Sequence, residues 1–145
     1  MKTLSIAGDR VNILVDGNDT AQAYAVFEAT IPPGAGPPPH VHSREDETFF
    51  VLEGEITFHL GDKVIVLKKG EFLFAPRGIP HHFKNTAGTH TVLLETASPA
   101  GMDRFIEAVG QPLPDRNAPA LPPTKPDVER MLKLAPEFGI TMLGR

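Results

Sequence analysis

The sequence predicts an all-β protein, a sandwich or barrel of short strands that is followed by short helices. Three observations lead to this fold class. Apolar and polar residues alternate in runs of about four to eight residues through most of the chain, as half-buried strands require. Turn-forming residues separate these runs at short intervals, and the 145 residues include 13 glycines and 15 prolines. After Thr96 the pattern changes, and apolar residues recur at helical spacing.

The first third of the chain predicts three strands. Residues 3–6 and 10–15 are short strand candidates, and a turn follows them at residues 16–19. A longer strand is expected over residues 21–31, with Phe27 facing the opposite side from Val26. The proline-rich segment 32–39 ends regular pairing because proline lacks a backbone donor. We expect this segment to lead stiffly into His40.

The middle of the chain carries the strongest strand signal. Gly54, the pair Gly61–Asp62 and the segment 76–80 supply turns between alternating runs. The strands expected there are residues 48–53, 55–60, 63–68, 71–75, 81–85 and 91–96.

Two helices are expected after residue 97. Ser98–Pro99 can cap and begin a helix over residues 100–109, which Gly110 would end. Beyond a proline-rich connector, Thr124 and Asp127 have the spacing of a capping box for a second helix. Its apolar residues at helical spacing are expected to pack on the barrel or on a partner subunit; they are Val128, Met131, Leu132 and Ala135. The segment 138–140 is expected to be a terminal strand or a docking segment.

Length and composition favour one domain, in which residues 1–97 form the barrel and residues 98–145 a helical extension. A chain of 145 residues can bury a sizeable core, so a metal would serve function more than folding. The formal net charge of −4 argues against a nucleic-acid or anionic-membrane partner. The chain has no cysteine, no signal-peptide pattern and no apolar run long enough to span a bilayer. We therefore expect a cytoplasmic protein.

One short segment contains the residue types of a metal site. His40 and His42 are two residues apart, so on a strand their side chains share a face at a Cα separation of about 7 Å. Glu47 follows after enough residues for a turn, and its carboxylate can approach the same ion. Alternatively, these are surface histidines beside an acidic loop, and this short pattern alone does not separate the two interpretations.

Several neighbouring polar residues have simpler interpretations. Glu45 and Asp46 are expected in a solvated acidic loop, although Glu45 would replace Glu47 if the latter pointed away. Arg44 could meet an anionic substrate, but a surface salt bridge is favoured. His82 has the opposite strand parity from His81 and is expected outside the ligand set. Three further residues are expected to be peripheral: His59 and His90 in solvent and Asn85 in a turn.

The motifs around these residues resemble those of the cupin superfamily. The first motif is present as Gly34-x5-His40-x-His42-x4-Glu47-x6-Gly54, and the second as Gly70-x5-Pro76-x-Gly78-x2-His81-x3-Asn85. The resemblance covers about residues 10–97. It implies a double-stranded β-helix, or jelly-roll, barrel with a divalent metal held by His40, His42, Glu47 and His81. The chain also resembles the small single-domain, quercetin-dioxygenase-like cupins through Gly101-x3-Phe105 and residues 138–140.

The implied ligand set has consequences for the barrel interior. Three imidazoles and one carboxylate suit one divalent transition-metal ion, Fe, Mn, Ni, Co, Cu or Zn, with one or two positions open for a ligand. If Glu47 points inward, so do Phe49 and Val51, and if His81 points inward, so do Phe83 and Asn85. Phe58 and Phe74 are further candidates for an apolar wall.

Three functional hypotheses follow. The first is a metal-dependent dioxygenase that acts on a small aromatic or enolisable substrate, with Glu47 doubling as a catalytic base. The second is a non-redox metal-dependent isomerase or hydrolase. The third is a non-catalytic cupin that binds a small molecule. We also expect a homodimer, because the outward residues Thr48, Phe50 and Leu52 need cover.

Overall fold

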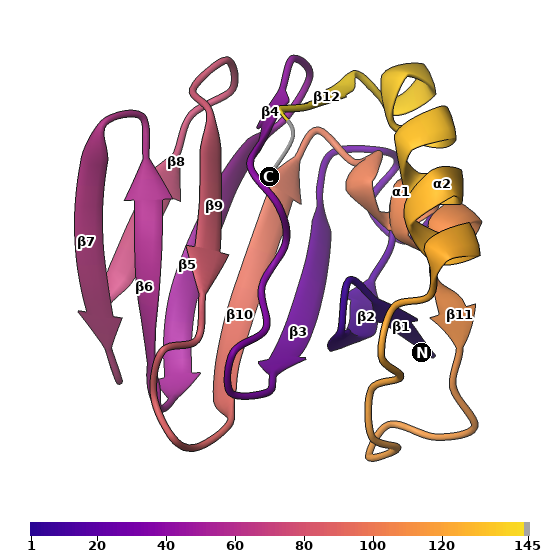
Figure 1. The fold of residues 1–145 in the computed structure, drawn as a ribbon. Coiled ribbons are helices and arrows are strands. Elements are labelled where there is room, and N and C mark those ends of the chain that lie inside the picture. Colours follow the sequence, from indigo (N-terminus) through magenta and orange to yellow (C-terminus); the bar gives the residue numbers. More distant parts are fainter. Residues whose placement is uncertain (144–145) are drawn as a thin grey trace.

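The computed structural model describes residues 1–143 and consists mainly of two antiparallel sheets that face each other (Figure 1). The seven-stranded sheet has the order β11 (Gln111–Pro112), β1 (Lys2–Ile6), β2 (Asp9–Val15), β3 (Ala25–Ile31), β10 (Thr91–Ser98), β5 (Asp46–Glu53) and β8 (Phe72–Ala75). The five-stranded sheet has the order β12 (Ile140–Met142), β4 (His40–His42), β9 (His81–Lys84), β6 (Glu55–Leu60) and β7 (Lys63–Lys68). The predicted all-β class is confirmed.

Side-chain alternation places the core between the two sheets. On β3, Ala25, Phe27, Ala29 and Ile31 are all buried, while the residues between them are partly exposed. The inward parity expected from Glu47 and His81 is also confirmed, because Phe49, Val51, Phe83 and Asn85 are all buried. A contiguous apolar core therefore fills the space between the two sheets.

The third strand begins later than the sequence predicts. Residues 21–24 form a turn, because Ala21 and Gln22 adopt positive φ angles of 53° and 68°. The Gln22 amide donates a hydrogen bond to the Gly17 carbonyl at 2.7 Å, which closes this turn. Tyr24 is consequently 46 % exposed and does not pair in the sheet.

The proline-rich lead-in to β4 is fixed against β9. The amide of Gly34 donates to the Asn85 carbonyl at 2.7 Å, and the Asn85 amide donates to the Ala35 carbonyl at 2.9 Å. Gly36 has a φ of 149°, and a Cβ there would lie 2.0 Å from the carbonyl oxygen of Phe83. Only glycine fits this contact, and the close approach sets the position at which β4 begins.

Helices α1 (Met102–Val109) and α2 (Lys125–Leu134), with a 3-10 turn at Ala135–Phe138, lie together at one side of the barrel (Figure 1). Gly110 ends α1 as predicted, and its amide donates to the Ile106 carbonyl at 2.8 Å. The predicted N-cap is wrong. Ser98 is the last residue of β10, and Gly101 precedes the helix without a side-chain cap.

The capping box of α2 is confirmed. The amide of Asp127 donates to the Thr124 hydroxyl, and the Thr124 amide donates to the Asp127 carboxylate. The packing of this helix is only partly as expected. Ala135 belongs to a smaller apolar cluster with Phe105, Val109 and Ile140, and Met131 packs against it. Val128 and Leu132, however, are 47 % and 53 % exposed. These two residues belong to neither apolar cluster of residues 1–143.

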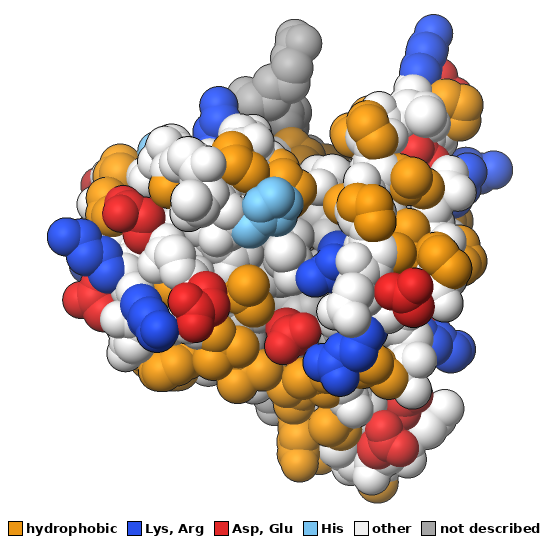
Figure 2. Space-filling view, turned by 90° about the horizontal axis from the view of Figure 1, so that it is seen from below, with side chains coloured by type: hydrophobic (Ala, Val, Ile, Leu, Met, Phe, Trp, Pro, Cys, Tyr) orange, Lys and Arg blue, Asp and Glu red, His pale blue; other side chains and the backbone are white. Residues whose placement is uncertain are grey.

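The surface also carries apolar groups. Viewed from below, the molecule shows hydrophobic side chains gathered along one edge, with charged groups on either side (Figure 2). The exposed aromatic residues on the outer face of the seven-stranded sheet are Phe50, Phe72 and Phe74. Among the described residues, no helix is long and apolar enough to cross a membrane.

Candidate metal centre

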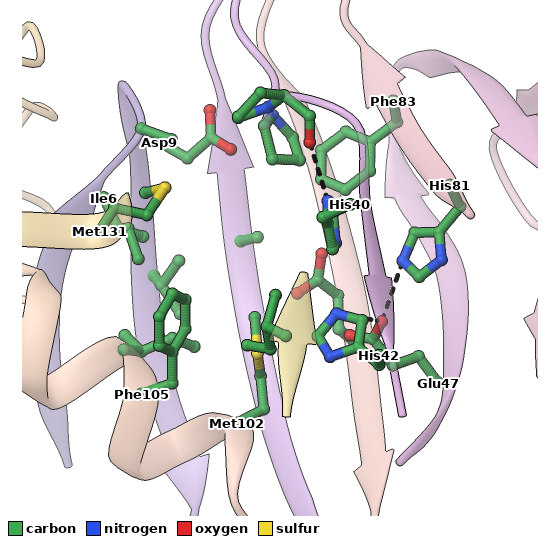
Figure 3. Close-up of a pocket in the computed structure, with 18 of the residues that line it drawn as sticks. Ile6, Asp9, His40, His42, Glu47, His81, Phe83, Met102, Phe105 and Met131 are labelled. Carbon is green, nitrogen blue, oxygen red and sulfur yellow. Dashed lines mark hydrogen bonds and ion pairs between the residues drawn. The ribbon is translucent and has the colours of Figure 1, made fainter. Parts of the chain in front are cut away.

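Four predicted ligand residues come together inside the barrel. His40 and His42 lie on β4, Glu47 on β5 and His81 on β9, and His40 pairs directly with His81 in the sheet. One ligand atom from each residue lies within 4.8 Å of all the others, and all four side chains are buried. Figure 3 shows the imidazoles and the carboxylate directed toward one another. His40, His42, Glu47 and His81, which come from three strands, thus share one small volume.

Two atoms at the centre of this cluster lack hydrogen-bond partners. Oε1 of Glu47 lies 3.0 Å from Nε2 of His42 and 3.0 Å from Nε2 of His81. Yet His42 Nε2 and Glu47 Oε1 are both buried without a hydrogen bond of acceptable geometry among the described residues. Burying unpaired polar atoms is unfavourable unless something else satisfies them. A cation placed between these atoms would do so, and the donor set therefore fits a metal ion.

Each imidazole is oriented by a partner at its other nitrogen. Nδ1 of His40 lies 2.8 Å from the Pro38 carbonyl oxygen, and Nδ1 of His81 lies 3.3 Å from that of Ile79. Nδ1 of His42 lies 2.5 Å from Oε1 of Glu45. Because these oxygens accept hydrogen bonds, each Nδ1 carries the proton and each Nε2 presents its lone pair. This is the tautomer that binding of a metal through Nε2 requires.

The charges in the cluster shift its pKa values in different directions. Burial, reinforced by His81 and His42, lowers the pKa of His40 to about 4. Burial would raise the pKa of Glu47, but His42, His81 and His40 outweigh it and lower that pKa to about 2. Burial lowers the pKa of His42, whereas Glu47 and Glu45 raise it, and the net shift is upward. The cluster thus contains an ionised carboxylate beside a neutral His40 at neutral pH.

Two of three residues near the cluster, Glu45 and Arg44, behave differently from the sequence prediction, and the third, Asp46, agrees with it. Glu45 is not in a solvated loop, because it is 2 % exposed and holds His42. Asp46 does face solvent, where it pairs with Arg77 at the turn before β9. Arg44 donates a hydrogen bond to the Glu137 carbonyl and so holds the C-terminal segment, with no carboxylate partner among the described residues.

The remaining histidines lie outside the cluster. His82 faces the outer side of the sheet, as its parity predicts, and its ring stacks on His59 with centroids 4.2 Å apart. His59 is therefore only partly exposed, whereas His90 is exposed as expected. Asn85 is a buried structural residue, and its side-chain amide donates to the carbonyls of Ile31 and Thr89.

Comparison with known proteins agrees with this architecture. Residues 27–96 match the model of the Cupin_2 family, described as a cupin domain. The chain contains a cupin domain. Its fold is the double-stranded β-helix that the motifs imply, and a predicted oxalate decarboxylase from Thermotoga maritima has a similar structure. That similarity has a TM-score of 0.61 and 25% identity, and it covers 68% of this chain and 90% of the other.

Two curated relatives of the cupin domain have different functions. An oxalate-binding protein from Thermotoga maritima is 36% identical over 59 residues, which are 41% of this chain and 49% of that protein. Quercetin 2,3-dioxygenase from Bacillus subtilis is 26% identical over 108 residues, which are 74% of this chain and 32% of that protein. The matched part thus spans about half or less of the relatives' length.

The cluster of His40, His42, Glu47 and His81 lines a cavity of about 80 Å³ in the cupin domain. Apolar side chains form most of the wall, and Phe49, Phe83, Met102, Phe105 and Met131 are among them (Figure 3). A second pocket of about 300 Å³ adjoins this cavity and shares five of its lining residues, Met131 and Met142 included. A ligand at the cluster would therefore be surrounded by apolar and thioether groups.

Phe58 and Phe74, which were candidates for the apolar wall of the cavity, do not line it. Phe74 is 50 % exposed on the outer face of β8, so it cannot line the interior. Phe58 is fully buried and its ring centroid lies 6.0 Å from that of His81, but it stands behind the cavity wall. Phe58 supports the His81 ring without facing the cavity.

Two acidic residues in the cavity were missed by sequence reasoning. Asp9 on β2 and Glu95 on β10 both line it. Burial raises the pKa of Asp9 well above its usual value. Burial, with the negative charges of Glu47 and Asp9, does the same for Glu95. Strand parity could have indicated that these two residues face inward. Asp9 is two residues from the buried Val11 and Glu95 is two residues from the buried Leu93, so each shares a strand face with a core residue.

Proposed function

We propose that the cupin domain holds one divalent transition-metal ion on His40, His42, Glu47 and His81, and acts as a metal-dependent dioxygenase on a small aromatic or enolisable substrate. One observation carries this proposal: four buried ligand atoms converge at the wall of a mainly apolar cavity. A cluster on the surface would support metal binding alone. A cluster inside a cavity also supports binding of a second, organic ligand.

The donor set indicates the class of ion. Three imidazole nitrogens and one carboxylate oxygen suit Fe, Mn, Ni, Co, Cu or Zn in the divalent state. Four protein ligands leave one or two positions of a five- or six-coordinate ion for exogenous groups. When bound, a redox-active ion supplies Lewis acidity and one-electron chemistry between an enolate and dioxygen.

The protein groups have separate tasks in this proposal. Phe49 and Phe83 exclude water and hold the apolar part of the substrate. Glu47, ionised and facing the cavity, accepts the proton of a substrate hydroxyl or enol as that group binds. Glu45 keeps His42 oriented through its Nδ1.

A non-redox reaction is the second candidate, and Glu95 is the observation that favours it. Glu47 is held ionised while the pKa of Glu95 is raised, so one carboxyl is set as a base and its neighbour as an acid. Such a pair suits proton transfer in an isomerisation, with the ion as Lewis acid. The third candidate is binding without turnover, which the same cavity allows.

The cavity itself argues against a small dianion as the preferred ligand. One relative is named as an oxalate-binding protein. In this chain, however, a ligand that reached beyond the cluster would meet Asp9 and Glu95, both acidic and both surrounded by apolar groups. A second carboxylate on the ligand would lose its water there, and no lysine or arginine among the described residues lines the cavity to pair with it. An uncharged aromatic or enolisable molecule fits better.

Elemental analysis followed by oxygen uptake tests the proposal. About one equivalent of iron, manganese, nickel, cobalt or copper per chain, with oxygen uptake on a flavonol, a diketone or a catechol, is the expected result. Glu47→Gln should lower the uptake rate far more than His82→Ala, the matched control outside the cluster. Turnover with zinc and without oxygen would support the non-redox candidate instead. No metal after reconstitution would show the proposal to be wrong.

A further inference from the structure

Asp9 is a buried carboxyl with an unsatisfied oxygen in the cavity wall. Its side chain is 5 % exposed, and Oδ1 has no hydrogen-bond partner among the described residues. In Figure 3 it lies across the cavity from His81 and Glu47, with its carboxyl directed into the space between. Leaving a buried acceptor unpaired is unfavourable, so a structural role would normally provide a partner within the protein.

We propose that Asp9 forms a second subsite, which hydrogen-bonds a hydroxyl group on the ligand whose other end occupies the metal centre. This inference rests on the proposed function and names its substrate class: a molecule with an enolisable head, an apolar body and a hydroxyl group at a distance from the head. The unpaired Oδ1 is the acceptor of that hydroxyl.

The chemistry of the surroundings favours a neutral hydroxyl over a cation. Burial raises the pKa of Asp9 well above its usual value, so the uncharged acid is the favoured form. An uncharged carboxyl both accepts and donates hydrogen bonds to a hydroxyl group, and no charge has to be desolvated. The apolar wall between Asp9 and the cluster matches an apolar ligand body.

The subsite is built by segments outside the matched cupin region. Asp9 precedes residues 27–96, and Met102, Phe105 and Met131, which line the same cavity, follow them. Figure 3 shows these three side chains on the side of the cavity away from His81. The cluster end is therefore supplied by the matched region, and the opposite end, which selects the ligand, by the flanking segments.

A matched set of probes tests the subsite. The probes are benzoylacetone, which offers an enolisable diketone and a phenyl ring, and its 2-, 3- and 4-hydroxyphenyl analogues. Dissociation constants are measured on zinc-loaded protein, because zinc does not undergo redox reactions and the probes survive. The proteins are the wild type, Asp9→Ala, Asp9→Asn and the control Asp62→Ala, which changes an exposed carboxyl in the β6–β7 turn.

We expect at least one hydroxylated probe to bind the wild type about 3–10-fold more tightly than benzoylacetone, as one net hydrogen bond allows. Asp9→Ala should abolish this preference and leave benzoylacetone binding within about twofold. Asp9→Asn, which keeps an acceptor, should retain part of it, and Asp62→Ala all of it. These ratios would not change if Asp9 were only structural.

The experiment distinguishes failure of the proposed metal centre from failure of the proposed Asp9 subsite. Zinc content is measured first, and a chain that takes up no zinc overturns both the metal centre and the subsite. A zinc-loaded chain that binds no probe, or prefers none of the hydroxylated ones, overturns the subsite alone. An equal preference in the wild type and in Asp9→Ala does the same, because the hydroxyl group would then be bound elsewhere.

Discussion

Glu45 and His42 form a buried pair, with Oε1 of the carboxylate 2.5 Å from Nδ1 of the imidazole. The two residues are three apart in the sequence, and a short bend between β4 and β5 turns Glu45 back toward the strand. The carboxylate accepts a hydrogen bond from Nδ1–H and so directs Nε2 toward Oε1 of Glu47, 3.0 Å away. The acidic segment after His42 is therefore part of the cluster's support.

Removing this support should weaken metal binding without removing a ligand. We expect Glu45→Gln to lower metal affinity about 10–100-fold, because the amide no longer fixes the His42 tautomer as an ionised acceptor does. Competition with a chelator of known affinity measures the change. Glu53→Gln, at an exposed carboxylate, is the control. An unchanged affinity in Glu45→Gln would mean that the pair only closes the bend.

Loss of an imidazole should remove the metal and leave the fold. We expect His42→Ala and His81→Ala to retain far less than one equivalent of metal while keeping the wild-type circular dichroism spectrum. The core of the barrel is continuous without the cluster, which is the physical reason for an intact fold. His82→Ala, on the outer face, should keep full metal content. Unfolding of either cluster variant at room temperature would indicate a structural metal instead.

The raised pKa of Asp9 predicts the direction in which the stability of the fold changes with pH. A carboxyl whose pKa is higher in the folded than in the unfolded chain favours folding at low pH, and that advantage is lost as pH rises above the unfolded value near 3.9. In metal-free protein, Asp9→Asn should therefore gain stability over the wild type between pH 5 and pH 8. The slope of the difference is at most about 1.4 kcal/mol per pH unit.

Urea unfolding at several pH values measures this difference. The same comparison with Asp62→Asn, in an exposed turn, should give a flat difference across that range. A stability difference that shrinks with pH for Asp9→Asn would contradict a buried, unpaired acid, and would point to a carboxylate that is ionised and held by a partner.

The outer aromatic residues predict an association surface. Phe50 pairs with Phe72 across β5 and β8, and Phe74 follows on the same face; Phe72 and Phe74 are 58 % and 50 % exposed. We propose that two copies pair through this face, because exposed aromatic groups in a row favour burial. Phe72→Asp should raise the dimer dissociation constant at least tenfold, as light scattering after size exclusion would show.

The control for association lies on the other sheet. Val64 on β7 is 62 % exposed, so Val64→Asp adds the same charge at an equally exposed apolar position. It should leave the oligomeric state unchanged. A wild-type protein that is monomeric at micromolar concentration would refute the dimer.

The parts of the fold that local rules determine were predicted well. Residues 55–60 and 63–68 form β6 and β7 with the expected bounds, because Gly61–Asp62 allows only a tight hairpin between two alternating runs. The capping box at Thr124 is equally local, and it too is present. The assignment of metal ligands stays a prediction, although the structure brings the four residues together. The division of the chain at residue 97 into a barrel and a helical extension also stays a prediction.

The errors arise where tertiary contacts override local preference. Ser98 has the composition of an N-cap, but its strand continues through it and its hydroxyl donates to the Ala23 carbonyl. Val128 and Leu132 have helical spacing, yet α1 contacts only the neighbouring face of α2. Asp9 and Glu95 look like ordinary polar strand residues, and only the closure of the barrel places them inside. Sequence periodicity gives which residues share a face, but not which polar group that face encloses.

Methionine side chains lie where the two pockets of this protein adjoin. Met131 and Met142 line both the inner cavity and the larger pocket beside it, and Met102 faces the inner cavity. If the cluster reacts with dioxygen, these sulfur atoms are easily oxidised groups in the cavity wall, and sulfoxide formation would turn an apolar wall polar. The extent of methionine oxidation would then report how often the oxidant reacts with the protein in place of the substrate. Peptide mass spectra of used enzyme, compared with Met1 as an exposed reference, would show where oxidant escapes from the barrel.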